Sequence, residues 1–300
     1  MLKQKNYKPF EIPETVRFEK NRLGLTKLII SNVFTDAEIY LYGANLTHFQ
    51  PKGEDPVIFS GKKCEMFPDK TLHAGIPICW PWFGPHPSDS TKPQHGFARD
   101  RLWVVKETRQ LENGETKVTL GLSEDDASLL LFPHAFDLLL TFIVGKSLRI
   151  TLKTLNKSTE AFKITQALHS YFYVSDIDNV RVLGVENTAY IDANENNSKK
   201  QSEGCPLLID KVINRIYIPT ESQCCIQDSG KERMIIIDKK GSQSTTIWNP
   251  GKNNNLHDLP ANLYRKFVCI ETVNAADDNI TLKAGKSHQI MQEIKLSKIT

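Results

Sequence analysis

A single carboxylate interrupts an apolar run near the C-terminal end of the sequence. Glu271 directly follows Phe267-Val-Cys-Ile270. A charged group inside a buried strand is costly unless it is paired or functional, and burial raises the pKa of a carboxyl group. Glu271 is therefore a candidate general base. A structural ion pair with a lysine or arginine explains the same pattern, and on the pattern alone it is the simpler explanation.

One histidine falls on the polar face of a predicted strand. Between residues 161 and 174, one parity holds Phe162, Ile164, Leu168, Phe172 and Val174, and the other holds Lys163, Thr165, Ala167, His169, Tyr171 and Tyr173. Successive strand residues point to opposite faces, so His169 is expected on a face lined by tyrosines and a lysine. An imidazole there could act as a general acid. A solvent-facing strand histidine is the simpler alternative on the pattern alone.

A third candidate feature is the segment 73–99. It holds five of the fifteen prolines, two of the four tryptophans and three of the eight histidines. Prolines fix φ and remove backbone donors, which excludes a regular helix or a central strand. The segment predicts a rigid, aromatic-walled loop that presents His73, His86, Gln94, His95 and Arg99. Such loops suit flat ring substrates, above all sugars, although a stiff loop covering a core has the same composition.

Composition indicates an ordinary soluble protein. The chain has 300 residues, 38 basic and 35 acidic, with a net charge of +3, which argues against nucleic acid or membrane as the main partner. The N-terminus has no apolar core of signal-peptide length, and the most apolar stretch, 128–145, is interrupted too early to span a bilayer. Six cysteines without a CxxC pair favour reduced thiols and a cytoplasmic location.

Period-two alternation dominates the chain and predicts an all-β fold. Strands are expected at 116–122, 137–144, 148–154, 161–174 and 234–238, separated by short polar turns. Many short strands of this kind indicate a large antiparallel β-sandwich or barrel. The polar segment 192–204 and the segment 250–260 are expected to be loops. No linker composition demands a boundary, so residues 1–300 are expected to form a single domain.

Several of these segments resemble one enzyme family. GIPICWPWFGP (75–85) and PQHGFAR (93–99) are similar to the signature of the glucose-6-phosphate 1-epimerases, also called hexose-6-phosphate mutarotases, of the galactose-mutarotase-like superfold. Further matches follow in order: ALHSYFYVSDI (167–177), WNP (248–250) and VCIET (268–272). The resemblance covers about residues 20–295. It implies a galactose mutarotase-like supersandwich of two large sheets.

The resemblance also implies a reaction, the interconversion of the α and β anomers of a hexose 6-phosphate. Glu271 would remove the proton of the C1 hydroxyl, and His169 would protonate the ring oxygen O5 from the opposite side of the hemiacetal. The aldehyde forms, the C1–C2 bond rotates, and the ring closes again. Neither a metal nor a nucleotide cofactor is needed. Gln94 and His95 would bind sugar hydroxyls, and Arg99 would hold an anionic group.

Three departures from the family pattern affect the substrate cradle rather than the acid and base. His73 replaces an arginine that contacts phosphate, Asn214 replaces an aspartate, and Gly251 replaces a tryptophan. Arg215 is a second candidate cation beside Arg99.

Two alternatives therefore stay open: an epimerase for neutral aldoses, which His73 favours, and a non-catalytic sugar-binding protein on the same fold. Retention of both His169 and Glu271 argues against the second. The expected partner is a small-molecule sugar or sugar phosphate, and the protein is expected to be a monomer.

Overall fold

The computed structural model describes residues 6–60, 72–220, 223–253, 256, 258–260 and 262–299. In these ranges the regular structure is almost entirely antiparallel β-strand, with one short α-helix, α1 (Asp126–Leu131). The all-β prediction is confirmed. None of the helices in these ranges is long and apolar enough to cross a membrane. Five cysteines here are free thiols, and Cys64 lies outside the described residues.

The strands of the described residues form four sheets, given in spatial order. The largest consists of β16 (Leu207–Leu208), β13 (Val180–Leu183), β18 (Cys224–Asp228), β19 (Arg233–Lys240), β23 (Ser287–Lys298), β9 (Leu148–Asn156), β8 (Phe136–Val144), β7 (Thr116–Ser123) and β6 (Val104–Gln110). The second consists of β15 (Ser198–Gln201), β14 (Ala189–Asp192), β17 (Ile213–Tyr217), β20 (Ser244–Asn249), β21 (Phe267–Asn274), β11 (Gln166–Leu168) and β5 (Ile78–Cys79), with β12 (Tyr171–Tyr173) also paired to β21.

Two smaller sheets complete the set. They are β1 (Val16–Lys20), β2 (Thr26–Ser31), β3 (Thr35–Tyr40) with β4 (Leu46–Pro51), and β10 (Phe162–Ile164) with β22 (Ile280–Leu282). Short 3₁₀ helices are η1 (Lys8–Phe10), η2 (Ala98–Asp100), η3 (Ile177–Asn179), η4 (Ala193–Glu195), η5 (Ser229–Lys231), η6 (Leu263–Lys266) and η7 (Ala276–Asp278).

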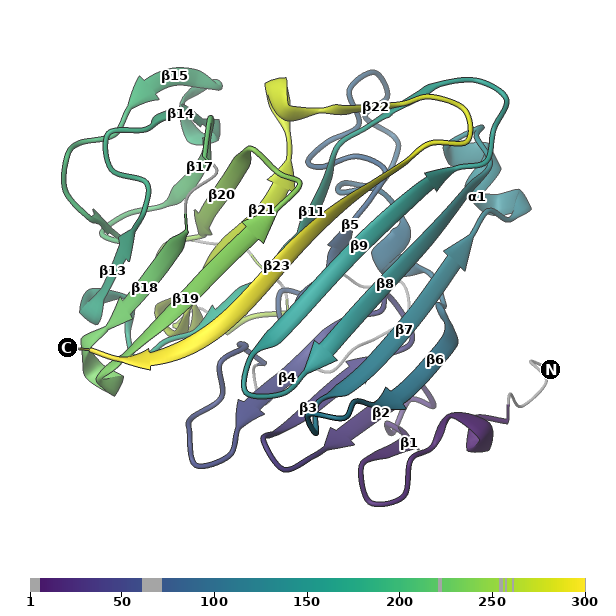
Figure 1. Ribbon diagram of the computed structural model, residues 1–300. Coiled ribbons are helices and arrows are strands. Elements are labelled where there is room, and N and C mark those ends of the chain that lie inside the picture. The colour runs from purple at the N-terminus through teal and green to yellow at the C-terminus, as the bar shows by residue number, and fades with distance from the viewer. Residues whose placement is uncertain are drawn as a thin grey trace.

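The two large sheets lie face to face and share one apolar core (Figure 1). Leu152 of β9 and Ile290 of β23 belong to this core together with Ile270 of β21. β9 alternates between buried and more exposed residues over its whole length, as the sequence predicts for a half-buried strand. The strands predicted at 116–122, 137–144, 148–154 and 234–238 fall within β7, β8, β9 and β19. β23 lies in the middle of its sheet, between β19 and β9.

The strand predicted at 161–174 is wrong as a single element. It is divided into β10, β11 and β12. Two backbone contacts break it: the Thr165 amide donates to the Pro81 carbonyl, and the Ser170 amide donates back to the Leu168 carbonyl. The predicted alternation of faces holds, because the residues of the apolar parity belong to the shared core. The segment 192–204 is also not all loop, since it contains η4 and the edge strand β15.

The tryptophans of the segment 73–99 anchor it to the protein interior and do not form the aromatic wall that the sequence predicts. Trp80 is fully buried and packs against Phe97 and Phe136 in the core. Trp82 is also buried, and His86 packs edge-on against it. β5, near the start of the segment, pairs with β11 and so fixes the loop to the edge of the second large sheet. These contacts attach the segment to the core and to the sheet edge.

Gly96 allows the two arms of this segment to approach closely. Its φ is +72°, and a Cβ atom at this position would lie 2.0 Å from the Trp80 carbonyl oxygen. The next residue, Phe97, donates its amide to the same carbonyl. Gly84 has a similar φ of +78°, but a Cβ there would have no atom within 4 Å. A side chain at Gly84 would therefore cause backbone strain alone, whereas a side chain at Gly96 would cause backbone strain and steric overlap.

We expect Gly96→Ala to lower the free energy of unfolding by ~2–5 kcal/mol, from left-handed backbone strain together with overpacking. Gly84→Ala should lose only the strain, ~1–2 kcal/mol. Urea denaturation of both variants and the wild type measures the difference. Equal losses in the two variants would show that the contact with Trp80 does not constrain the loop.

Candidate active site

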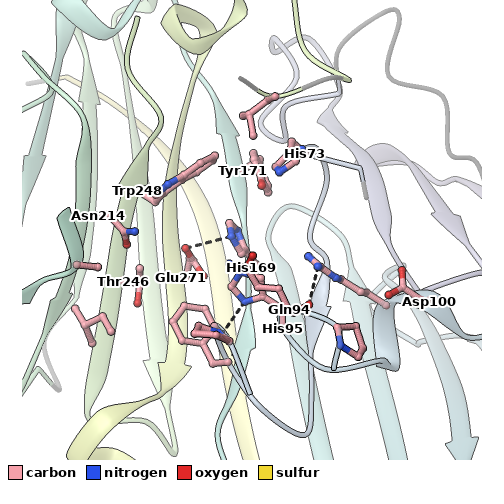
Figure 2. A pocket seen from close by; sticks show the side chains of 18 of the residues that line it. His73, Gln94, His95, Asp100, His169, Tyr171, Asn214, Thr246, Trp248 and Glu271 are labelled. Atoms are coloured by element: carbon pink, nitrogen blue, oxygen red, sulfur yellow. Dashed lines mark hydrogen bonds and ion pairs between the residues drawn. The ribbon is translucent and has the colours of Figure 1, made fainter. Parts of the chain in front are cut away.

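A cavity of about 810 Å³ opens on the face of the second large sheet that points away from the core. β17, β20 and β21 supply its floor, and the segment 73–99 supplies a wall (Figure 2). The lining residues used below are His73, Phe83, Gln94, His95, Arg99, His169, Tyr171, Asn214, Thr246, Trp248 and Glu271. Phe83 is the aromatic residue of the loop that reaches the cavity, whereas Trp80, Trp82 and His86 do not line it.

His169 and Glu271 meet at the floor of this cavity. The register of β11 and β12 on β21 places them opposite one another on neighbouring strands. His169 Nε2 lies 3.5 Å from Glu271 Oε1 (Figure 2). Glu271 is 1% exposed and His169 is 8% exposed. Both groups line the same cavity.

Aromatic rings hold the His169 imidazole in place. The Tyr171 ring stacks on it almost in parallel, with centroids 4.9 Å apart and an angle of 9°. The rings of His95 and Trp248 approach it edge-on, at 5.6 Å and 6.0 Å. These contacts limit rotation of the imidazole and keep bulk water from most of its surface.

Burial pushes the pKa values of the two groups toward their neutral forms. It raises the pKa of Glu271 well above its ordinary value. It also lowers the pKa of His169 well below its ordinary value, and the positive charge of Arg99 adds to this effect. Burial thus favours a neutral carboxyl beside a neutral imidazole, and the two groups titrate as a coupled pair.

His95 is held as a neutral hydrogen-bond donor. Its Nδ1 accepts the Gly84 amide at 3.1 Å, which places the ring proton on Nε2. Burial, followed by the charge of Arg99, lowers its pKa to about 3. The Gln94 side chain lies 3.4 Å from this Nε2, and the Gln94 carbonyl accepts a bond from Arg99 at 2.8 Å. The three predicted residues of the QHGFAR segment thus form one connected group in the cavity wall.

Four cavity residues each keep a buried polar atom that has no hydrogen-bond partner among the described residues. These atoms are Arg99 Nε, His169 Nδ1, Thr246 Oγ1 and Glu271 Oε2. Buried polar groups are rarely left unpaired without a reason. Together they offer donors and acceptors to a ligand with several hydroxyl groups. Thr246 was not predicted from the sequence, although it shares its strand face with Trp248 and pairs across strands with Glu271.

His73 reaches the cavity with a carboxylate behind it. Its ring Nδ1 and its backbone amide each lie 2.7 Å from an oxygen of Asp258, and its ring stacks near Trp248. Burial opposes ionisation of Asp258, but the hydrogen bonds from His73 hold the pKa of this carboxyl below its usual range. A protonated His73 therefore presents a charge that Asp258 largely compensates.

Arg215 does not reach the cavity, which corrects its expected place beside Arg99. Asn214 and Ile216 line the cavity, and strand alternation turns Arg215 to the other face of β17. Its guanidinium lies 4.6 Å from the centroid of the Tyr190 ring and 3.9 Å from Asp192. The structure thus brings together every other predicted site residue: His73, Gln94, His95, Arg99, His169, Asn214 and Glu271. Within the described ranges, no three His, Cys, Asp or Glu side chains are grouped so that they could hold a metal ion.

The known proteins that this chain resembles carry related names. The aldose 1-epimerase family model matches residues 27–295. A Salmonella typhimurium protein named "Putative glucose-6-phosphate 1-epimerase" is 33% identical over 253 residues, which cover 84% of each chain. A Cenchrus ciliaris protein of the same name is 32% identical over 89% of this chain and 83% of its own.

Solved structures agree in fold. The crystal structure of a "putative mutarotase" from Salmonella typhimurium superposes with a TM-score of 0.89 at 29% identity, covering 97% of this chain and 96% of that one. Galactose 1-epimerase from Lactobacillus acidophilus shares the fold with a TM-score of 0.74 at 12% identity, over 95% and 99% of the two chains. The predicted galactose mutarotase-like sandwich is confirmed.

The raised pKa of Glu271 predicts a pH-dependent cost to stability. Its ordinary value is 4.5, and a pKa raised in the folded state means that stability is lost as the pH rises above that value. Glu271→Gln removes this ionisation. We expect the stability advantage of the variant over the wild type to grow by up to ~1.4 kcal/mol per pH unit, until Glu271 ionises in the folded protein.

Urea denaturation of both proteins between about pH 5 and pH 8 tests this expectation. Because Glu271 titrates together with His169, the difference between the two proteins reports the coupled pair. A difference that stays constant across this range would mean that Glu271 is already ionised in the folded wild type at the lowest pH.

Proposed function

Because this chain belongs to the aldose 1-epimerase family, we propose that it interconverts the α and β anomers of a hexose 6-phosphate, with glucose 6-phosphate as its substrate. Glu271 is the base and His169 is the acid. The observation that carries the proposal is the pair itself: one carboxyl and one imidazole, 3.5 Å apart at the floor of a large cavity. The unpaired polar atoms around the pair support a polyhydroxylated ligand.

Ring opening starts from the form of the pair in which the proton lies on His169. Glu271 takes the proton of the C1 hydroxyl while His169 donates its proton to O5. The C1–O5 bond breaks, and its electrons go to O5 as the C1–O1 bond becomes a carbonyl. The two reacting oxygens are bonded to the same carbon, so adjacent acid and base groups fit them. General acid–base catalysis of this kind is worth ~10²–10⁴-fold.

Ring closure runs the same steps in reverse on the other face of the carbonyl. After rotation about C1–C2, His169 takes the proton from O5 and Glu271 returns its proton to O1. The pair holds one proton before opening, in the aldehyde complex and after closure. Burial favours the form with the proton on Glu271, which is the form that ring opening produces.

The remaining residues bind the sugar. Gln94, neutral His95 and Asn214 face the cavity and offer amide and imidazole groups to hydroxyls. Arg99 supplies the positive charge for the phosphate, since its planar fork matches phosphate oxygens. His73 adds charge when it is protonated.

One observation favours an epimerase for neutral aldoses as the second candidate. Asp258 bonds His73 through both carboxylate oxygens, so much of the charge that an arginine would offer here is cancelled. Arg215, the other candidate cation, lies outside the cavity. A phosphate would then depend mainly on Arg99.

We also propose that the chain forms one domain and acts as a monomer in the cytoplasm. One apolar core joins residues from Val16 to Ile294, which supports a single domain. Cys79, Cys205, Cys224, Cys225 and Cys269 are free thiols, which suits a reducing compartment.

We expect Glu271→Gln and His169→Asn each to lower the rate of anomer exchange by ~10²–10⁴-fold, because each removes one of the two proton-transfer groups. NMR exchange spectroscopy on glucose 6-phosphate measures the rate, with the spontaneous rate subtracted. Glu293→Gln is the matched control, since Glu293 pairs with Arg149 on the other large sheet. Exchange near the wild-type rate in folded Glu271→Gln would refute the assignment of the base.

The phosphate preference should depend on Arg99. We expect glucose 6-phosphate to be preferred over glucose, because the Arg99 guanidinium offers a positive charge to the phosphate. Arg99→Ala should erase most of this preference, because a charge-assisted contact to phosphate is worth ~1.5–3 kcal/mol, or about tenfold and more.

His73→Arg should strengthen the preference, since arginine is always charged and matches phosphate oxygens. His86→Arg, in the same loop but outside the cavity, should leave the preference unchanged. The measurement is kcat/KM for both sugars. Equal values for the two sugars in the wild type would favour the neutral-aldose alternative.

A further inference from the structure

The main-chain ladder is interrupted where the acid and base lie. β11 ends at Leu168, opposite Thr272, and β12 begins at Tyr171, opposite Cys269. Between them the Ser170 amide bonds the Leu168 carbonyl of its own strand instead of continuing the ladder to β21. The ladder to β21 therefore has a gap at His169 and Ser170, between the paired residues Leu168–Thr272 and Tyr171–Cys269.

A side chain from the other large sheet occupies the core directly behind this interruption. Gln292 lies on β23 and is fully buried. Its Oε1 accepts a bond from Ser170 Oγ at 2.5 Å. Its Nε2 donates to Thr272 Oγ1 at 3.1 Å and to the Ile270 carbonyl at 3.4 Å. One amide thus contacts the residue that follows His169 and the two residues that flank Glu271.

Strand alternation explains why this contact bears on the pair. Ser170, Ile270 and Thr272 point into the core, so their neighbours His169 and Glu271 point into the cavity. A shift of either backbone segment changes the distance between the imidazole and the carboxyl. Proton transfer to two oxygens on one carbon tolerates little change, since a misplacement of about 1 Å can cost ~10²-fold.

We propose that Gln292 is a positioning residue that fixes the separation of His169 and Glu271 by bonding the residues beside each of them across the strand interruption. Gln292 carries no charge and does not line the cavity, so it acts on the reaction through the geometry of the pair. The inference rests on the proposed function only for its kinetic consequence, because the geometric consequence can be measured without turnover.

Gln166 provides a matched control. It is equally buried and also connects the two large sheets, accepting from Thr154 Oγ1 on β9 and donating to Asn274 on β21. Methionine preserves the size of either glutamine without its hydrogen bonds. Gln292→Met and Gln166→Met should therefore lose similar stability, whereas only Gln292→Met removes the contact behind the pair.

We expect Gln292→Met to lower kcat for anomer exchange by ~10- to 100-fold with little change in KM. Gln166→Met should keep a kcat within about threefold of the wild type. In ¹⁵N-histidine NMR, the pH titration of the His169 ring should shift in Gln292→Met and not in Gln166→Met. This second measurement reports the pair directly, whether or not the substrate is the one proposed.

Two milder variants decide the question if Gln292→Met does not fold. Ser170→Ala and Thr272→Val each remove one bond to Gln292, and each should lower kcat by ~3- to 10-fold and shift the His169 titration. A wild-type titration and a wild-type kcat in the folded variants would overturn the proposal. A shifted titration together with a wild-type protein that exchanges no anomers would support the positioning role and refute the proposed function.

Discussion

The burial of one carboxyl group is the constraint on which the site depends. Glu271 is almost inaccessible to water, and one of its oxygens has no partner among the described residues. Such a group is stable only if it stays protonated or shares a proton with a neighbour. His169 is that neighbour, and its own burial makes a second proton unfavourable. A shared proton that moves between two poorly solvated groups gives acid and base chemistry without any net change in charge.

The sheet that carries this pair serves two opposite requirements. One face packs against β9, β23 and their neighbours in an apolar core. The other face carries buried polar atoms that have no hydrogen-bond partner among the described residues. Neighbouring residues of β21 therefore have different roles: Ile270 packs in the core, and Glu271 faces the cavity. The cost of the unpaired polar atoms is offset by the large core directly beneath them. The core-facing residues next to His169 and Glu271 are held by hydrogen bonds to the buried amide of Gln292. We propose that this contact fixes the positions of the two cavity-facing side chains.

The sequence was sufficient for what depends on local pattern. Alternation predicted the strands and placed His169 on the polar face, and the prolines and tryptophans predicted a rigid loop at 73–99. The same alternation could have excluded Arg215, because it cannot share a face with Asn214. The sequence did not predict contacts between segments that are far apart along the chain. Asp258 bonds His73 from 185 positions away, and the break after Leu168 depends on how the loop meets the sheet.

The central place of β23 has a consequence for how the molecule is assembled. The strands on either side of it, β19 and β9, are joined within their sheet only through residues 287–298 in the described part of the chain. The two halves of the sheet cannot be joined until these residues have paired with both neighbours. Before that, β19 and β9 each present an exposed strand edge, a state that is prone to aggregation. Completion of the sheet is therefore a long-range event, and the same event brings Gln292 into contact with the opposite sheet.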